Sequence, residues 1–320
     1  MKKKVLILSI SLFLVLVISF LFFYSFCLNV QSFPKFDKEG ISFIVVNDMG
    51  RLGYYEQKPI ANLIGKFAEE NDIKFVAVAG DPHHYMGVQS VCDPLWMTNF
   101  ESIYNHPELQ IPWNVVLGNH EYRGNTQAIL DYTNISRRWN APARYFLQNE
   151  MTKSGEKCLF VYIDTTPLIY KYRKDKEDYP DAYKQNMQSE INWIDSVLTM
   201  SNAKWKFVIG HHPVYAYTLK DENECIDMQQ SIGDILEKNN VDAYICGHIH
   251  SFQHIKPADK KVNYIVNSSA SQSRAVKKTE GTIFCSPDPG FSVFSVTSER
   301  TSIYFINQKG KTIYEYTINK

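Results

Sequence analysis

The chain has 320 residues and a mass of 37.1 kDa, and its 34 Lys and Arg balance its 34 Asp and Glu. This balance provides no excess of positive charge to attract nucleic acid, so no nucleic-acid partner is expected. Hydrophobic residues make up 44% of the chain and charged residues 21%, which excludes a disordered or collagen-like chain and supplies enough apolar surface for a folded core.

Residues 1–30 are expected to carry the protein into or across a membrane. Lys2, Lys3 and Lys4 precede an uncharged stretch from Val5 to Pro34, and its apolar core approaches the ~20 residues that a membrane-spanning helix needs. A cleavable signal has a shorter apolar region of ~7–15 residues, followed by a small-x-small site. The length and flanks favour an uncleaved anchor, with the lysines inside and the rest exported. In the alternative, a cleaved signal leaves a secreted or periplasmic protein.

Residues 36–320 are expected to form one catalytic domain of the α/β class. Short apolar runs predict strands, and helical spacing of apolar residues predicts helices between them. Because strands and helices alternate, a largely wound α/β sheet is expected, followed by hairpins near the carboxyl end. The predicted strands are 41–47, 74–79, 113–117, 159–163, 205–209 and 242–246, the helices 58–70, 185–200 and 227–239, and the hairpin strands 291–296, 302–306 and 312–317.

Polar residues of metal-binding type directly follow five of the predicted strands. Because ligands bind at the carboxyl ends of strands in a wound sheet, these residues are expected to converge on one place. Each cluster alone is typical of a turn or a helix cap, but their ordered recurrence indicates a shared site. The clusters are Asn47-Asp48-Met49-Gly50, Gly80-Asp81-Pro82-His83-His84, Gly118-Asn119-His120-Glu121, Gly210-His211-His212-Pro213 and Gly247-His248-Ile249-His250.

This series of motifs resembles the dinuclear, calcineurin-like metallophosphoesterases and, within them, the small tartrate-resistant purple acid phosphatases. The segment Tyr132–Tyr145 (YTNISRRWNAPARY) is also similar to the one that follows the Gly-Asn-His motif there. The motif match spans roughly residues 41–300. The resemblance implies a four-layer α/β/β/α sandwich, and it implies hydrolysis of small phosphomonoesters by a metal-bound hydroxide.

The resemblance also implies a role for each motif residue. His120 would lie beside the metals as the acid that protonates the leaving alcohol, and an ordinary imidazole pKa suits that task. Carboxylate, imidazole and amide ligands suit two ions such as Fe, Mn or Zn. The implied ligands are Asp48, His84 and His250 for the first metal, Asp81 as the bridge, and Asn119, His211 and His248 for the second metal.

One position departs from the family pattern. The second motif of purple acid phosphatases ends in a metal-binding Tyr, whereas this chain has His84 there. A one-residue slip that uses Tyr85 is the alternative. His84 is favoured because its spacing from Asp81 is unchanged and imidazole is a common ligand. Losing a tyrosinate removes a negative ligand, so a divalent pair is favoured over one that contains ferric iron.

Three further histidines are expected near the site. His83 and His212 are expected to face the pocket mouth and to touch substrate oxygens, with a solvated or supporting role as the alternative. His254 follows the last motif and is expected to orient a metal ligand.

Two other functions on the same fold stay open at this stage. A phosphodiesterase or nucleotide pyrophosphatase would use the same metals with a different pocket rim. A non-catalytic, anchored binding module would be expected to have lost metal ligands, whereas here only one position changes, and it changes to another ligand type.

Overall fold

The computed structural model of the chain describes residues 15, 17–19, 33–36 and 39–320. The predicted N-terminal membrane segment therefore lies almost entirely outside the described residues. Among the helices that are described, none combines the length and apolar character needed to cross a bilayer. The chain divides into two compact units, residues 1–34 and 35–320, and the second unit contains all the elements below.

The described part of the second unit contains two mixed, seven-stranded sheets. In the first sheet, β1 to β4 run parallel and β12 to β14 are antiparallel. Its order is β14 (Thr312–Asn319), β13 (Arg300–Asn307), β12 (Gly290–Val296), β1 (Ile41–Val46), β2 (Ile73–Val78), β3 (Trp113–Val115) and β4 (Trp139–Asn140). The order of the second is β11 (Thr282–Ser286), β9 (Phe252–Ile255), β10 (Asn263–Val266), β8 (Ala243–Cys246), β7 (Trp205–Ile209), β6 (Lys157–Tyr162) and β5 (Phe146–Met151).

The core lies between the two sheets, where alternate side chains of the strands meet. Phe43 of β1 stacks on Phe75 and Phe294 of its own sheet and meets Phe160 of the other sheet edge-on. The neighbouring Ile44 points to the other face and is also fully buried. Strands buried on both faces read as continuous apolar runs, which explains why the central strands could be predicted from sequence.

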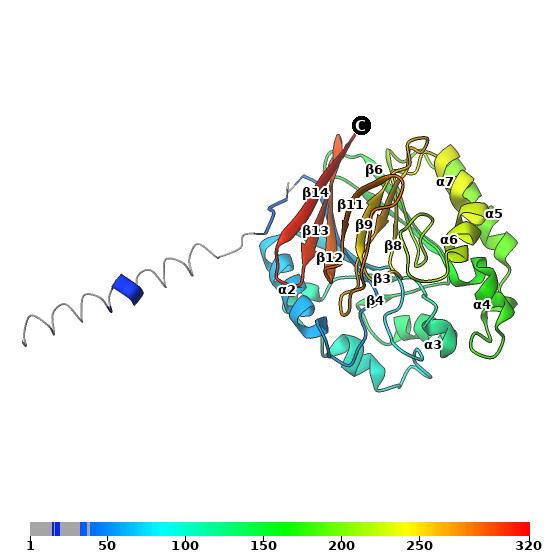
Figure 1. Ribbon diagram of the computed structural model, residues 1–320, viewed down its shortest axis with the longest axis horizontal. Coiled ribbons are helices and arrows are strands. Elements are labelled where there is room, and N and C mark those ends of the chain that lie inside the picture. The colour runs from blue at the N-terminus through cyan, green and yellow to red at the C-terminus, as the bar shows by residue number, and fades with distance from the viewer. Residues whose placement is uncertain (1–14, 16, 20–32, 37–38) are drawn as a thin grey trace, which may run out of the picture. The chain divides into compact units, whose positions relative to one another are not determined.

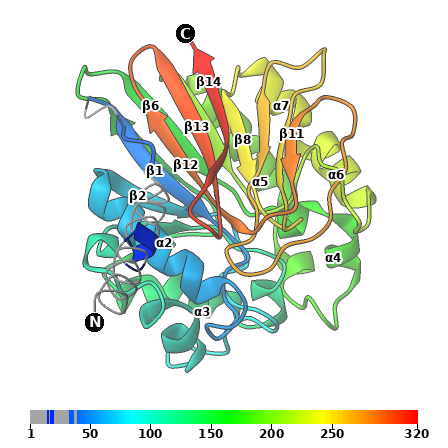
Figure 2. The same cartoon turned by 60° about the vertical axis from the view of Figure 1, so that its left-hand side comes forward.

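Helices cover the outer faces of both sheets, as Figure 1 shows, and Figure 2 shows the same arrangement from the side. The helix α2 lies against the first sheet, and α5, α6 and α7 lie on the outer side of the second. The described helices are α2 (Gln57–Glu70), α3 (Thr126–Asp131), α4 (Tyr170–Lys174), α5 (Met187–Met200), α6 (Asn223–Met228) and α7 (Asp234–Lys238).

The predicted elements agree with the structure at the central strands, at α2 and α5, and at the hairpin strands β12 to β14. The helix predicted over 227–239 is interrupted: a π-helical turn, Gln229–Gly233, separates α6 from α7. The extra residue in such a turn shifts the buried face, so a single 3.6-residue period does not describe the segment. The short strands β4, β5, β9, β10 and β11 were not predicted.

The two sheets bring five strand ends to one edge of the molecule. Within the first sheet, Met49 donates its amide to the carbonyl of Asp81 (3.2 Å), and within the second, Gly247 donates to the carbonyl of His211 (3.0 Å). Between the sheets, the Nδ1 atom of His211 lies 2.8 Å from the carbonyl oxygen of Ala79. The loops that follow β1, β2, β7 and β8 are thus fixed to one another by hydrogen bonds.

Candidate metal centre

Four of the residues predicted to bind metal have a left-handed backbone. Their φ angles are 48° at Asp48, 53° at Asp81, 69° at His248 and 62° at His250. Residues other than glycine rarely adopt positive φ, because the Cβ atom crowds the backbone. Such strain persists only where the surrounding structure over-determines it, and it concentrates at functional sites.

Two glycines allow the motif loops to approach one another closely. A Cβ atom on Gly80 would lie 2.3 Å from the Nδ1 atom of His211, and Gly80 also has a φ of 84°. A Cβ atom on Gly118 would lie 2.1 Å from the Oδ1 atom of Asp81. Both distances are far below van der Waals contact, so only glycine fits at either position.

The first group of ligand-type atoms comprises Asp48, His84 and His250, whose side-chain atoms lie within 4.8 Å of one another. His250 Nε2 is 2.8 Å from Asp48 Oδ1. His84 Nε2 is 3.9 Å from the same oxygen and 3.6 Å from Asp81 Oδ2. Tyr85, the alternative ligand, is 57% exposed, so the His84 ring lies among the carboxylates instead.

The second group forms around the other side of Asp81. The Oδ2 atom of Asp81 lies 3.1 Å from His211 Nε2, and that nitrogen lies 3.2 Å from His248 Nδ1. Asn119 is buried, and its Oδ1 atom has no hydrogen-bond partner among the described residues. Asp81 therefore lies between the two groups, as a bridging ligand would.

Several buried side-chain atoms of these groups that could bind a metal have no hydrogen-bond partner in the described part of the chain. They are Asn119 Oδ1 and both ring nitrogens of His84, and Asp81 Oδ2 has only its ion pairs with histidine rings, the closest with His211. A buried polar atom without a partner costs roughly 1–3 kcal/mol, so such atoms rarely gather in one place without a ligand. Carboxylate, amide and imidazole atoms are ligands for divalent transition metals. The residues present therefore fit a pair of such cations.

The electrostatics of the two groups also suit cations. Burial alone would raise the pKa of Asp48, but His250 and His211 hold it well below its usual range. Burial lowers the pKa of His248 to about 3, which keeps its ring neutral. Burial would likewise lower the pKa of His211, but the Asp81 carboxylate raises it to about 9. A bound metal would therefore displace the proton of His211, and the ionised carboxylates could bind the metal as they are.

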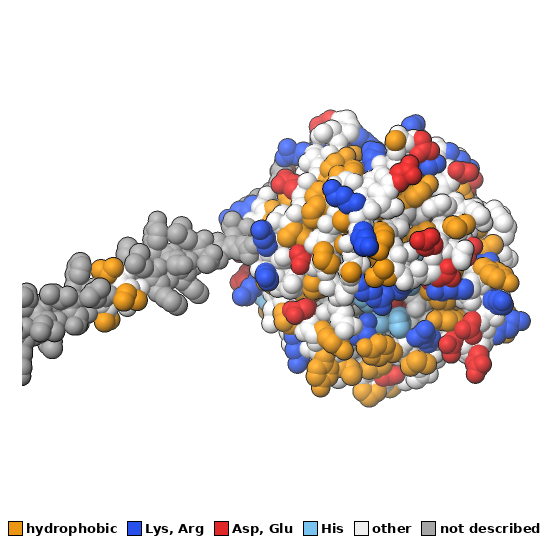
Figure 3. Space-filling model, viewed as in Figure 1, with side chains coloured by type: hydrophobic (Ala, Val, Ile, Leu, Met, Phe, Trp, Pro, Cys, Tyr) orange, Lys and Arg blue, Asp and Glu red, His pale blue; other side chains and the backbone are white. Residues whose placement is uncertain are grey.

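His120 lies at the edge of the two groups and is partly exposed. Its ring centre is 4.1 Å from that of His84, and its Nε2 atom is 3.8 Å from Asp81 Oδ2. Its Nδ1 atom is 2.6 Å from the carbonyl oxygen of Tyr85. A carbonyl can only accept, so Nδ1 carries the proton of that bond and Nε2 is directed toward the centre. Figure 3 shows histidine side chains reaching the surface in a hollow beside Lys and Arg side chains.

His83 and His212, which were expected to face the pocket mouth, are both completely buried, and this favours the supporting role that was the alternative. The His83 ring meets Trp96 edge-on at 4.6 Å, and its Nδ1 atom lies 3.3 Å from the side-chain amide of Asn99. His212 Nδ1 lies 2.8 Å from the Thr165 hydroxyl. The His212 ring packs 4.3 Å from that of His248, and one of its ring nitrogens lies within 4.8 Å of ring nitrogens of His211 and His248.

His254 is also not where the sequence analysis placed it. Its Nδ1 atom is bonded to the Tyr314 hydroxyl (2.8 Å) and its Nε2 atom to the Asn263 side chain (3.1 Å). Because both nitrogens are occupied by these partners, the ring orients no metal ligand.

Glu121 has a supporting role that the sequence analysis did not assign. Its Oε2 atom accepts from the amides of Gly118 (2.8 Å) and Asp81 (3.1 Å), and its Oε1 atom accepts from the amide of His83 (3.1 Å). This buried carboxyl group thus joins the loops after β2 and β3. Its position directly after His120 in a motif was the only signal in the sequence.

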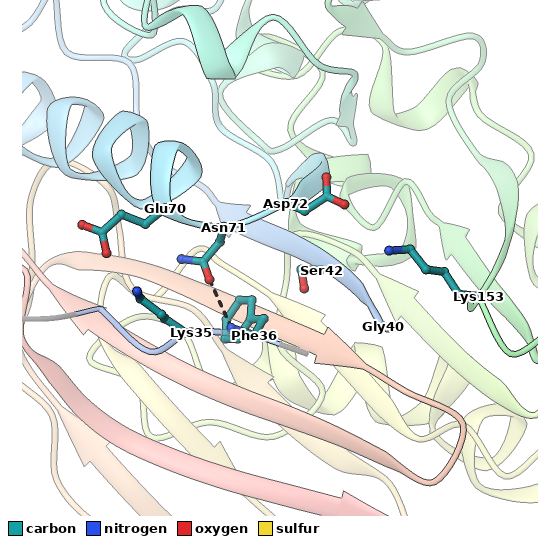
Figure 4. A pocket seen from close by; sticks show the side chains of 8 residues that line it. All are labelled: Lys35, Phe36, Gly40, Ser42, Glu70, Asn71, Asp72 and Lys153. Carbon is teal, nitrogen blue, oxygen red and sulfur yellow. Dashed lines mark hydrogen bonds between the residues drawn. The ribbon is translucent and has the colours of Figure 1, made fainter. Parts of the chain in front are cut away.

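A separate hollow of about 440 Å³ lies near the start of β1 and contains none of these residues. It is lined by Lys35, Phe36, Gly40, Ser42, Glu70, Asn71, Asp72 and Lys153 (Figure 4). Ser42 and Asp48 lie at opposite ends of the strand, so this hollow is not part of the metal centre.

Glu224 holds His248 from the side opposite to the second metal group. Its Oε2 atom is 2.7 Å from His248 Nε2, and its Oε1 atom accepts from the Tyr172 hydroxyl at 2.8 Å and contacts the Lys171 ammonium. A carboxylate on Nε2 places the ring proton there and leaves the lone pair on Nδ1, which faces both His211 (3.2 Å) and the Lys220 ammonium (3.0 Å). No motif in the sequence marked Glu224.

We predict that Glu224→Gln weakens binding of the second metal ion about 10- to 100-fold, because an amide cannot orient the imidazole as a carboxylate does. Competition with a chelator, monitored by elemental analysis, measures this change. Glu222→Gln is the matched control, since Glu222 is exposed two residues away. Equal metal affinity in both variants, with circular dichroism unchanged, would contradict a positioning role for Glu224.

Comparison with known proteins agrees with the site. The calcineurin-like phosphoesterase family matches residues 41–252. Purple acid phosphatase 4 of Arabidopsis thaliana is 31% identical over 304 residues, which cover 91% of this chain and 87% of the relative. Tartrate-resistant acid phosphatase type 5 of Oryctolagus cuniculus is 24% identical and covers 88% of this chain and 91% of its own length.

Solved structures show the same fold at lower sequence identity. The structure described as GAP50, the anchor in the inner membrane complex of Plasmodium, has a TM-score of 0.75 at 22% identity, covering 88% of this chain and 89% of that one. Purple acid phosphatase PPD1 from yellow lupin (Lupinus luteus) seeds has a TM-score of 0.61 at 15% identity, covering 88% and 54%. From the family match, the relatives and the converging ligand set together, this chain belongs to the calcineurin-like phosphoesterases, with purple and tartrate-resistant acid phosphatases among its relatives.

Proposed function

We propose that the protein hydrolyses phosphate monoesters at a centre that holds two divalent cations. The observation that supports this most directly is the set of buried, unpartnered ligand atoms around Asp81. Asp48, His84, His250 and Asp81 would hold one cation, and Asp81, Asn119, His211 and His248 the other. Two cations there would neutralise charge on the phosphoryl oxygens and acidify a water molecule.

The divalent metals that fit these ligands are Fe, Mn and Zn. His84 offers a neutral nitrogen where the relatives' motif has a Tyr, so the first metal would have one negative ligand fewer. A lower ligand charge favours a divalent ion over a trivalent one.

His120 would supply the proton that the leaving alcohol needs. Its Nδ1–H bond to the Tyr85 carbonyl fixes the ring, so Nε2 is the atom that faces the centre, and it donates when the ring is the doubly protonated imidazolium. An alkoxide is a poor leaving group in water, so protonating it as the P–O bond breaks lowers the barrier. The phosphate product and the alcohol then separate without a covalent link to the chain.

Lys220 supports monoesters over diesters as substrates. Its ammonium lies 3.0 Å from His248 Nδ1, and burial lowers its pKa to about 8, so it remains mostly charged at neutral pH. A second cationic side chain, Arg274, follows the other ligand loop and donates its amide to the His250 carbonyl. A monoester near neutral pH has up to two negative charges and a diester one, so added positive charge favours the monoester.

A phosphodiesterase is the alternative, because the same ligand set would serve both reactions. A non-catalytic binding role is less well supported. The solved structure described as an anchor is similar only at the level of the fold, and the ligand atoms in this chain are in place for cations.

We also propose that residues 1–30 anchor the protein in a membrane, with the catalytic unit exported. The support is the sequence alone: three lysines followed by a long uncharged apolar stretch.

We predict that His120→Ala lowers kcat about 10²- to 10⁴-fold for an alkyl phosphate such as 2-phenylethyl phosphate, and much less for 4-nitrophenyl phosphate, whose leaving group needs no proton. Steady-state kinetics at equal metal content measures both. His106→Ala is the control, because His106 is partly exposed and its Nε2 atom lies 3.9 Å from Glu69 of α2, outside the two metal groups. An equal loss for the two substrates would show that His120 is not the acid.

We predict that Lys220→Met lowers kcat/KM for a phosphomonoester about 10- to 100-fold, since one hydrogen bond between charged groups is lost. The loss should be smaller for bis(4-nitrophenyl) phosphate, a diester with one negative charge. Lys238→Met, which removes an exposed ammonium paired with Asp195, should change neither rate. If the wild type hydrolyses only the diester, the monoester proposal is wrong and the alternative replaces it.

We predict that the whole chain, from Met1, stays in the membrane fraction when membranes of producing cells are washed with alkaline carbonate. A hydrophobic helix of ~20 residues resists such extraction because its apolar surface would enter water. Release into the soluble fraction, with an amino terminus near residue 30, would show a cleaved signal instead.

A further inference from the structure

A recess of about 380 Å³ opens directly beside the first metal group. It is lined by Arg51, Leu52, Tyr54, Tyr55, His84 and Tyr85, and these residues are called the tyrosine recess below. His84 belongs both to the wall of this recess and to the first ligand group with Asp48 and His250. A molecule bound at the metals could therefore extend into the recess without leaving the surface.

The tyrosine recess exposes an unusual amount of aromatic surface. Tyr54 is 69% exposed, and Tyr55 and Tyr85 are each 57% exposed. Single exposed tyrosines are common, but three around one hollow beside a reactive centre are typical of a surface that meets a ligand. Figure 3 shows hydrophobic side chains gathered next to the histidines in the hollow.

His120 indicates which part of a substrate would reach the recess. The Tyr85 ring centre lies 6.3 Å from that of His120, and the Tyr85 carbonyl holds the His120 Nδ1 atom. Because His120 protonates the leaving oxygen, the carbon group on that oxygen lies on the His120 side of the centre. The aromatic wall formed by Tyr85 is thus next to the leaving group, and not next to the phosphoryl group.

Arg51 determines what kind of group suits this wall. Its guanidinium lies 4.6 Å from the centre of the Tyr85 ring, and the residue is only 6% exposed. Its Nε atom has no hydrogen-bond partner among the described residues. A buried planar cation that lies against one aromatic ring also attracts a second flat, electron-rich ring beside that pair. A saturated ring of equal size lacks the flat face that such stacking needs.

We propose that the tyrosine recess binds a planar aromatic group on the leaving alcohol of the phosphoester, so that aromatic phosphate esters are the preferred substrate class. This inference rests on the proposed phosphomonoesterase function for its choice of ligand.

The recess is tested first by binding, so that the result does not depend on turnover. The probes are benzylphosphonate and cyclohexylmethylphosphonate, two non-hydrolysable monoester analogues of matched size, titrated calorimetrically into the metal-loaded full chain. Benzylphosphonate should bind about 10-fold more tightly, which is the range measured for stacking on one aromatic side chain. In the triple variant Tyr54→Ala/Tyr55→Ala/Tyr85→Ala, which removes the aromatic wall and keeps the backbone carbonyl that holds His120, the ratio of the two affinities should fall toward one.

Kinetic measurements then distinguish the recess proposal from the proposed phosphomonoesterase function. For the wild type, kcat/KM should be about 10-fold higher for 2-phenylethyl phosphate than for 2-cyclohexylethyl phosphate, whose alcohols have similar acidity. Tyr183→Ala, at an exposed tyrosine outside the recess, should retain this ratio.

Equal binding of the two phosphonates by the wild type, or a preference that survives in the triple variant, would overturn the recess proposal. If both esters are hydrolysed at equal rates and the phosphonates bind equally, the phosphomonoesterase function stands and the recess proposal fails. If neither ester is hydrolysed but the phosphonate preference is present and lost in the triple variant, the recess proposal stands and the proposed function fails.

Discussion

The buried carboxylate of Asp81 is the point on which the rest of the site depends. It belongs to the first sheet, yet its Oδ2 atom lies 3.1 Å from His211 Nε2 of the second sheet. Its Oδ1 atom accepts from the His120 amide at 2.9 Å. A charge with almost no exposure is tolerated only when it is paired or bound to cations. The loops from both sheets are therefore arranged around one negative group, with His84, His120 and His211 all beside it.

The strain in this arrangement is held by the sheets on which the loops stand. Ligand residues at positive φ and unpartnered buried atoms both cost free energy. They are attached to strands whose side chains are packed on both faces, with the aromatic cluster around Phe43 joining the two sheets. Such a core is closely packed and changes shape reluctantly. The ligand atoms can thus remain near one another although the carboxylates repel and the loops are strained.

Two residues outside the ligand groups, Tyr85 and Glu224, contact histidines of the centre. Tyr85 contributes its carbonyl to orient His120 and its ring to the recess beside it. Glu224 connects His248 with Tyr172 near the surface. If the proposals hold, Tyr85 would couple substrate shape to the centre and Glu224 would couple metal affinity to it, although the motifs contain neither residue. Substitution at these positions would alter the properties of the centre without removing a ligand.

The sequence by itself determined the class of fold, the central strands and the polar residues that follow them, because each of these depends on local patterns. Apolar runs mark strands buried on both faces, and Gly-Asp or Gly-His pairs mark the strand ends. It did not determine the positions of His83, His212 and His254, since one residue along a turn decides whether a ring faces the centre, the core or another strand. Glu224 and the tyrosine recess also had no signal in the sequence, because their partners lie far away along the chain. Only the packing of the two sheets brings Asp81 to His211, and so only the tertiary structure decided which histidines share a centre.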